Sequence, residues 1–199
     1  MALLAAISCK FNIDQILPRL KKIKEVSGRL ELVRILPNKT KVFVDFAHTP
    51  DAMKKTILTL REQYNKKPEL IFGCGGERDQ KKRPLMAKIS EELCNKIYIT
   101  DDNPRNENPK LIRKMIIDAF KDKSKIFEIP FRSKAIKNAI SNSDPESIIL
   151  VAGKGHETTQ IYKNKIYNIS DKKIIKKIEY KKIKYNKKNN KQEFNKKII

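Results

Sequence analysis

Apolar and polar positions alternate along most of the chain in a way that predicts strands and helices in turn. Short runs of consecutive apolar residues are followed by segments of roughly a dozen residues whose apolar positions recur every three or four residues. The runs that predict strands are 42–47, 70–74, 97–100, 126–129 and 148–152. Helices are expected after the first four, at about 49–64, 84–94, 109–120 and 133–142. Because strands that are apolar on both faces need cover on both sides, we predict a Rossmann-like α/β domain, with a mostly parallel sheet and helices on both faces.

The two ends of the chain depart from this alternation. Residues 2–24 have apolar positions at helical spacing and predict helix up to Ser27-Gly28. Near the other end, residues 159–162 and 165–168 flank a two-residue turn and predict a C-terminal β-hairpin, followed by a helix from about Ser170. Beyond about residue 184 the chain is mostly Lys and Asn, which predicts a lysine-rich disordered tail at 185–199.

Composition narrows the class of protein. With 199 residues, 39% of them hydrophobic and 34% charged, and with no apolar run long enough to span a bilayer, we expect a cytoplasmic protein of one domain with appendages. The three cysteines have no metal-binding spacing and are expected to be reduced and structural. The net charge of +22 comes mostly from scattered lysines, since only nine of the 45 basic residues are arginine. This pattern predicts a solvated surface, while a module that binds polyanions or nucleic acid stays open as the alternative.

Polar and glycine-rich clusters follow four of the five predicted strands. They are DFAHTP at 45–50, GCGGERD at 73–79, DDNPR at 101–105 and GKGHE at 153–157. Ligands of open parallel sheets bind beyond the carboxyl ends of the strands, so the four clusters should converge in space. Together they bring arginine, amide, carboxylate and bare backbone to one edge. That combination suits a zwitterion with several carboxylates.

These clusters also have purely structural interpretations. Asp45 and His48 could cap the following helix, although Thr49 already provides the expected N-cap. The glycines of 73–76 could form only a tight turn. Arg105 differs, because it follows a proline on a short loop, where a guanidinium is pre-organised to bind a carboxylate through two hydrogen bonds.

The string GKGHETT is not a P-loop. The motif GxxxxGK[ST] needs a glycine where this chain has Ile148, and Gly155 occupies the Ser/Thr position. The chain therefore has clusters typical of a nucleotide-using site without a loop that binds the phosphates.

The chain resembles the C-terminal domain of the Mur ligase family in five strings, which follow one another between Gly28 and Asp171: GRLE, VDFAHTPDAM, FGCGGERDQKKRPLM, TDDNPR and LVAGKGHETTQ. By this resemblance residues 28–184 are the amino-acid-binding domain, and residues 1–27 are a remnant of the last helices of the central ATPase domain. The resemblance implies an ATP-dependent ligase of peptidoglycan synthesis, in which a carboxylate is activated as an acyl phosphate and attacked by an amine. The pattern DNPR is typical of the branch that adds meso-diaminopimelate to a UDP-linked dipeptide.

The resemblance also implies roles for single residues. Three would face ATP: Arg29, Asp45 and His48. Five would hold the diaminopimelate: Arg78, Asn103, Arg105, Gly153 and Glu157. The chemistry agrees, because arginines and a backbone amide suit the two carboxylates of diaminopimelate, and a glutamate suits its distal ammonium. No catalytic or metal-ligating residue is expected in this chain.

Several parts of the family's enzymes have no counterpart in this sequence. They are the UDP-sugar-binding N-terminal domain, the P-loop, and the carbamylated lysine and magnesium ligands of the central domain. We therefore expect the chain to be inactive alone and to need those N-terminal and central domains as partners. ATP, Mg²⁺ and the UDP-linked dipeptide would bind only to the complete enzyme. No membrane or nucleic-acid partner is expected.

Overall fold

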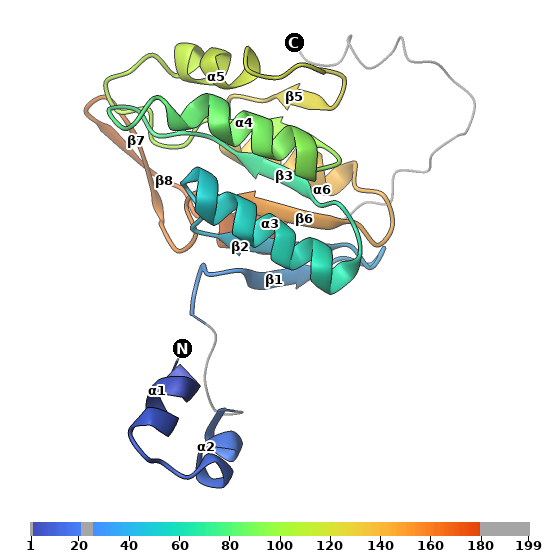
Figure 1. The fold of residues 1–199 in the computed structure, drawn as a ribbon. Helices are drawn as coiled ribbons and strands as arrows, with labels where there is room; N and C mark the ends of the chain where they lie inside the picture. Colours follow the sequence, from blue (N-terminus) through green and yellow to red (C-terminus); the bar gives the residue numbers. More distant parts are fainter. Residues whose placement is uncertain (1, 21–25, 180–199) are drawn as a thin grey trace.

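The computed structural model describes residues 2–20 and 26–179 (Figure 1). A six-stranded sheet has the order β1-β2-β6-β3-β4-β5, and a separate two-stranded sheet contains β7 and β8. The eight strands are β1 (Glu31–Ile35), β2 (Lys41–Asp45), β3 (Glu69–Phe72), β4 (Ile97–Ile99), β5 (Ile126–Glu128), β6 (Ile148–Ala152), β7 (Thr159–Tyr162) and β8 (Lys165–Asn168). In the large sheet only β1 runs antiparallel to its neighbour. The predicted α/β class with a mostly parallel sheet is therefore confirmed.

Helices cover both faces of the large sheet (Figure 1). One face packs against α3 (Pro50–Tyr64), α4 (Lys82–Leu93) and α5 (Pro109–Ile117). The other packs against α6 (Arg132–Ser141) and α7 (Asp171–Lys177). Successive residues of a strand enter opposite cores: Leu70 and Phe72 lie in the first, Ile71 in the second. All three side chains are fully buried, and each such burial contributes about 1.5–3 kcal/mol.

Local capping explains where two of these helices begin. The Ala52 N–H donates to Thr49 Oγ1 over 3.3 Å, and Pro50 takes the first helical position of α3. At α7 the Lys173 N–H donates to Ser170 Oγ over 3.4 Å. Both helix starts agree with the sequence-based predictions.

The N-terminal helical segment differs from its prediction. It forms two helices, α1 (Ala2–Ser8) and α2 (Ile13–Leu20), instead of one continuous helix. The interruption has a local cause, because Lys10 has a left-handed φ of 61° and Asn12 Oδ1 accepts the Asp14 N–H over 2.8 Å. Residues 21–24 of the predicted helix and the predicted tail at 185–199 lie outside the described residues.

The sheet also has one strand more than was predicted. Strand β1 lies at its edge and is only half-buried, with the Ile35 side chain 55% exposed. A half-exposed strand has no continuous apolar run, so its sequence gives a weak signal.

The cysteines are free, as expected, but only two of them are structural. Cys74 and Cys94 lie in the core, whereas Cys9 is exposed, so the expectation of a structural role was wrong for Cys9. Burial raises the pKa of both core thiols to about 12. Within the described ranges, no helix is both long and apolar enough to cross a membrane.

Candidate functional site

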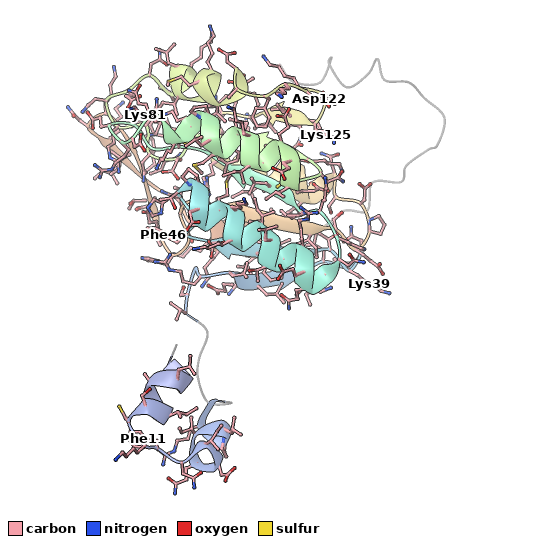
Figure 2. All side chains as sticks on the ribbon, in the orientation of Figure 1. Phe11, Lys39, Phe46, Lys81, Asp122 and Lys125 are labelled. Atoms are coloured by element: carbon pink, nitrogen blue, oxygen red, sulfur yellow. The ribbon has the colours of Figure 1, made fainter. Side chains whose placement is uncertain are left out.

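The sheet topology brings four loops together. Strands β2, β6, β3 and β4 are successive neighbours, so the four polar clusters that follow them lie side by side at the carboxyl edge of the sheet. Figure 2 labels Phe46 and Lys81 at this edge and Lys39 and Lys125 at the opposite edge. The structure therefore gathers in one place the loops that the sequence analysis singled out.

Two glycines let the segment before β1 approach the loop after β6. A Cβ atom placed on Gly28 would lie 2.3 Å from the backbone nitrogen of His156, and one placed on Gly155 would lie 2.8 Å from the backbone oxygen of Gly28. Both glycines have positive φ, at +73° and +53°. Larger residues would push these backbones apart. The close approach places Arg29 beside the GKGHE loop.

The loops after β3 and β4 are bonded to each other. The Gly76 N–H donates to the backbone carbonyl oxygen of Asn103 over 2.9 Å. Arg105 Nη1 donates to the backbone carbonyl oxygens of Gly76 and Asn103, over 2.9 and 3.3 Å. A Cβ atom on Gly75 would lie 3.0 Å from Arg105 Nη1 and 3.7 Å from Arg78 Cγ. The two predicted arginines therefore flank Gly75.

The two arginines differ in how firmly they are held. Arg105 has a left-handed φ of 52°, its N–H donates to the Ile161 oxygen over 3.0 Å, and its own oxygen accepts the Lys163 N–H over 2.7 Å. Ile161 in β7 and Lys163 in the turn after it thus hold the Arg105 backbone through both its N–H and its carbonyl oxygen. Arg78 is exposed, and its side chain forms no hydrogen bond or ion pair with any other described residue. Its guanidinium is therefore not held in place by any described part of the domain.

Asn103 and Glu157 lie together, and a lysine joins them. The Asn103 amide nitrogen donates to Glu157 Oε2 over 3.2 Å. Lys154 Nζ donates to the same Glu157 oxygen over 2.8 Å and to Asn103 Oδ1 over 3.3 Å. The Lys154 side chain is fully buried, while that of Glu157 is 34% exposed. Lys154 was not predicted as a site residue, because a lysine between two glycines gives no indication in the sequence that it is buried.

Gly153, which the resemblance places among the diaminopimelate-binding residues, has its backbone N–H engaged within the domain. The Gly153 N–H donates to the backbone carbonyl oxygen of Asp45 over 3.0 Å, so this backbone amide is occupied and does not face a ligand carboxylate. A Cβ atom on Gly153 would lie 3.0 Å from Asp102 Oδ2, so the glycine leaves room for that carboxylate. Asp102 was not singled out from the sequence, although it belongs to the DDNPR cluster.

The Asp45 carboxylate forms hydrogen bonds within the domain. Its Oδ1 accepts the Ala47 N–H over 2.8 Å and the Thr56 hydroxyl over 3.2 Å, and its Oδ2 accepts the Leu30 N–H over 2.6 Å. The residue is only 7% exposed. These bonds hold the start of β1 against the loop after β2.

An aromatic cluster lies next to Asp45. The guanidinium carbon of Arg29 lies 4.6 Å from the centre of the Phe46 ring, and the ring of His48 meets that of Phe46 edge-on at 4.7 Å. His156 stacks on Phe46 at 5.5 Å. Arg29 and His48, two of the residues predicted to face the nucleotide, therefore both contact the Phe46 ring. Phe46 and His156 were not predicted from the sequence, because neither residue type signals a contact by itself.

A buried network supports the DDNPR loop from the side of the hairpin. The Tyr162 hydroxyl donates to Asp101 Oδ2 over 2.8 Å, and Arg113 forms an ion pair with the same carboxylate. Burial and the Asp101 carboxylate raise the pKa of the Tyr162 hydroxyl, which keeps its proton and its role as donor. Among the described residues no group of three or more His, Cys, Asp or Glu side chains could hold a metal ion.

The chain is similar to known proteins both in sequence and in fold. Residues 28–155 match the family model described as Mur ligase, glutamate ligase domain. The UDP-N-acetylmuramoyl-L-alanyl-D-glutamate–2,6-diaminopimelate ligase of Buchnera aphidicola subsp. Baizongia pistaciae is 48% identical over 183 residues, which are 92% of this chain and 36% of the relative. The ligase of the same name from Haemophilus influenzae (strain ATCC 51907 / DSM 11121 / KW20 / Rd) is 42% identical over 168 residues, or 84% of this chain and 34% of the relative.

A solved structure of a ligase with that name superposes with a TM-score of 0.70 at 32% identity, covering 88% of this chain and 36% of the other. The chain thus spans about a third of the length of the relatives it matches. The family model covers all six strands of the large sheet, the three loops at 45–50, 73–79 and 101–105, and the fourth loop as far as Gly155. The chain therefore belongs to the Mur ligase family and contains its glutamate ligase domain.

Proposed function

We propose that residues 28–184 form the domain that binds meso-2,6-diaminopimelate in an ATP-dependent ligase of peptidoglycan synthesis. The ligase would join this amino acid to UDP-N-acetylmuramoyl-L-alanyl-D-glutamate. The observation that carries the proposal is the meeting of Arg78, Arg105, Asn103 and Glu157 at one edge of the sheet. Relatives at 42–48% identity that are named as this ligase support it.

The charges of the site match those of the ligand. Diaminopimelate has two carboxylates and two ammonium groups. We assign the carboxylates to Arg78 and Arg105, because guanidinium groups bind carboxylates through paired, charge-assisted hydrogen bonds. The distal ammonium is assigned to Glu157, whose carboxylate is partly exposed. Gly153, which has no side chain, leaves space for the Asp102 carboxylate beside it, and this carboxylate adds a second negative charge to the proposed ammonium site.

We assign ATP to the neighbouring part of the edge. Arg29 and His48 are exposed beside the Phe46 ring, which suits an anionic ligand with an aromatic base. Asp45 would hold this corner in place, since its carboxylate is already engaged within the domain. ATP would activate the acceptor carboxylate as an acyl phosphate. The family's central domain would supply the Mg²⁺ ligands and the phosphate-binding loop. The N-terminal and central domains would bind the UDP-linked dipeptide.

By this proposal the chain is inactive unless those domains are supplied. Its site would work in the cytoplasm, where the free cysteines stay reduced. The alternative function, a basic module that binds polyanions, rests on the net charge of +22.

Calorimetric titration of the chain distinguishes the two functions. We expect meso-diaminopimelate to bind more tightly than L-lysine, which lacks the second carboxylate. Duplex DNA should bind weakly, and any binding should fall steeply as salt rises from 50 to 200 mM, by about 10³-fold or more if six or more phosphates are contacted. Tight DNA binding without diaminopimelate binding would support the basic module instead.

A further inference from the structure

We infer that Lys154 is a positioning residue that orients Glu157 and Asn103 and thereby sets the selectivity of the site for an amino acid with a second ammonium group. The inference rests on the proposed function. It gives a role to a buried lysine that the ligand assignments above do not use.

The burial of Lys154 needs an explanation. Lys154 lies two residues after the end of strand β6, and its side chain is fully buried. A buried ammonium is costly unless it is paired and hydrogen-bonded. Here its partners are Glu157 Oε2 at 2.8 Å and Asn103 Oδ1 at 3.3 Å, both from residues proposed to bind the ligand. Since Lys154 has no exposed surface, it acts on a ligand through these two residues.

The three side chains form a closed triangle whose orientation is fixed. The Ile161 N–H donates to Asn103 Oδ1 over 3.0 Å, which directs the amide nitrogen of Asn103 toward Glu157. Lys154 and Asn103 both donate to Glu157 Oε2. Among the described residues, Glu157 Oε1 has no hydrogen-bond partner. The triangle therefore uses one carboxylate oxygen for positioning and leaves the other to meet an ammonium group.

The same contacts join two loops that the sheet keeps apart. Strands β6 and β4 are separated by β3, so the loops that follow them are not immediate neighbours. Lys154 comes from the first loop and reaches Asn103 on the second, two residues before Arg105. It thus fixes the spacing between the proposed ammonium-binding carboxylate and a proposed carboxylate-binding guanidinium. A ligand with charges at both ends is selected by that spacing.

A positioning role and a purely electrostatic role predict opposite results. If Lys154 only neutralised Glu157, removing its charge would strengthen binding of any ligand with an ammonium group near Glu157. If it positions Glu157, the Lys154→Met variant should lose affinity for meso-diaminopimelate but keep its affinity for 2-aminopimelate, which lacks the distal amine. We expect the affinity for meso-diaminopimelate divided by the affinity for 2-aminopimelate to fall about tenfold or more, as for the loss of a well-oriented charge-assisted hydrogen bond.

The test is calorimetric titration of the full chain with both ligands, for the wild type and for Lys154→Met. The matched control is Lys96→Met, which removes a lysine paired with the buried Glu69 at the opposite edge of the sheet and should leave the ratio unchanged. In a Glu157→Gln background, Lys154→Met should have little further effect on the ratio, because the two residues act through one contact.

Each outcome bears on one claim. Failure of the wild type to bind meso-diaminopimelate would overturn the proposed function. Wild-type binding with an unchanged ratio in Lys154→Met, or with tighter binding of both ligands, would overturn the positioning role alone. If thermal melting shows that Lys154→Met does not fold, Lys154→Arg keeps the charge but changes the geometry. Its ratio should still fall, and an unchanged ratio would overturn the inference.

Discussion

Arg132 and Asp171 form an ion pair inside the domain although they are 39 residues apart. Arg132 Nε donates to Asp171 Oδ1 over 2.9 Å and Nη2 donates to Oδ2 over 2.8 Å, and neither side chain is exposed. Nη2 also donates to the oxygen of Ala152, the last residue of β6. The pair therefore fixes the first turns of α6 and α7 to the strand from which the GKGHE loop begins.

Breaking this pair should destabilise the domain. We expect Asp171→Asn to lower the free energy of unfolding by about 3–5 kcal/mol, because it leaves a buried guanidinium without its counter-charge. Urea denaturation followed by circular dichroism measures the change. As a control, Lys55→Met removes the exposed pair with Asp51 and should cost less than about 1 kcal/mol. Equal losses in the two variants would contradict a structural role for the buried pair.

Arg105 should matter more for the amino acid than for ATP. In a complete ligase carrying this domain, Arg105→Ala should weaken the use of meso-diaminopimelate by about two to three orders of magnitude, because a charge-assisted contact is lost and a carboxylate is left unpaired. Arg105→Lys should not restore it, because Arg105 Nη1 donates to the carbonyl oxygens of Gly76 and Asn103 while its other guanidinium N–H groups stay available for a carboxylate, and a lysine has only one nitrogen for both tasks. Steady-state kinetics with each substrate varied provides the measurement. Equal effects on both substrates would indicate misfolding or a nucleotide role.

The chain alone should not release ADP. Its sequence contains no GxxxxGK[ST] loop to bind the phosphates of ATP. A coupled ADP assay with ATP, Mg²⁺ and meso-diaminopimelate should therefore stay at background. Release of ADP that depends on meso-diaminopimelate would show that the ATP site has been misplaced.

The three thiols should differ in reactivity. At pH 8 iodoacetamide should modify Cys9 in the folded protein, while Cys74 and Cys94 stay unmodified because they are buried and burial raises the pKa of each thiol to about 12. All three should react in denaturant. Mass spectrometry after a short exposure counts the modified sites, and rapid labelling of Cys74 or Cys94 without denaturant would contradict the packing described above.

The same pKa shift predicts how stability depends on pH. A thiol in the unfolded chain ionises near pH 9.0, whereas the two buried thiols stay protonated until about pH 12. Their contribution to stability is therefore complete below pH 9 and is lost as the pH rises toward 12. Replacing both with alanine should make the decline of the melting temperature between pH 9 and 11 less steep. An unchanged slope would show that other groups cause it.

The elements that the sequence predicts well are those with local signals. The β7–β8 hairpin has alternating positions around a two-residue turn, and α3 starts with an N-cap followed by proline. Strand β1 was missed because it is half-exposed and has no continuous apolar run. Lys154 was missed because its burial depends on tertiary contacts, with Glu157 and with Asn103, 51 residues away. Patterns along a chain show which loops meet, but not which side chains within those loops hold one another.

The most direct test of the account is to locate meso-diaminopimelate on the chain by ¹⁵N–¹H NMR titration. We expect the amide signals of 73–79, 101–105 and 153–157 to shift together and to saturate, because these loops form the proposed site. Signals at the opposite edge of the sheet, such as those of Lys39 and Lys125, should stay in place. Saturable shifts at that opposite edge, or no shifts at the three loops at any ligand concentration, would contradict the claim that the carboxyl edge binds the amino acid.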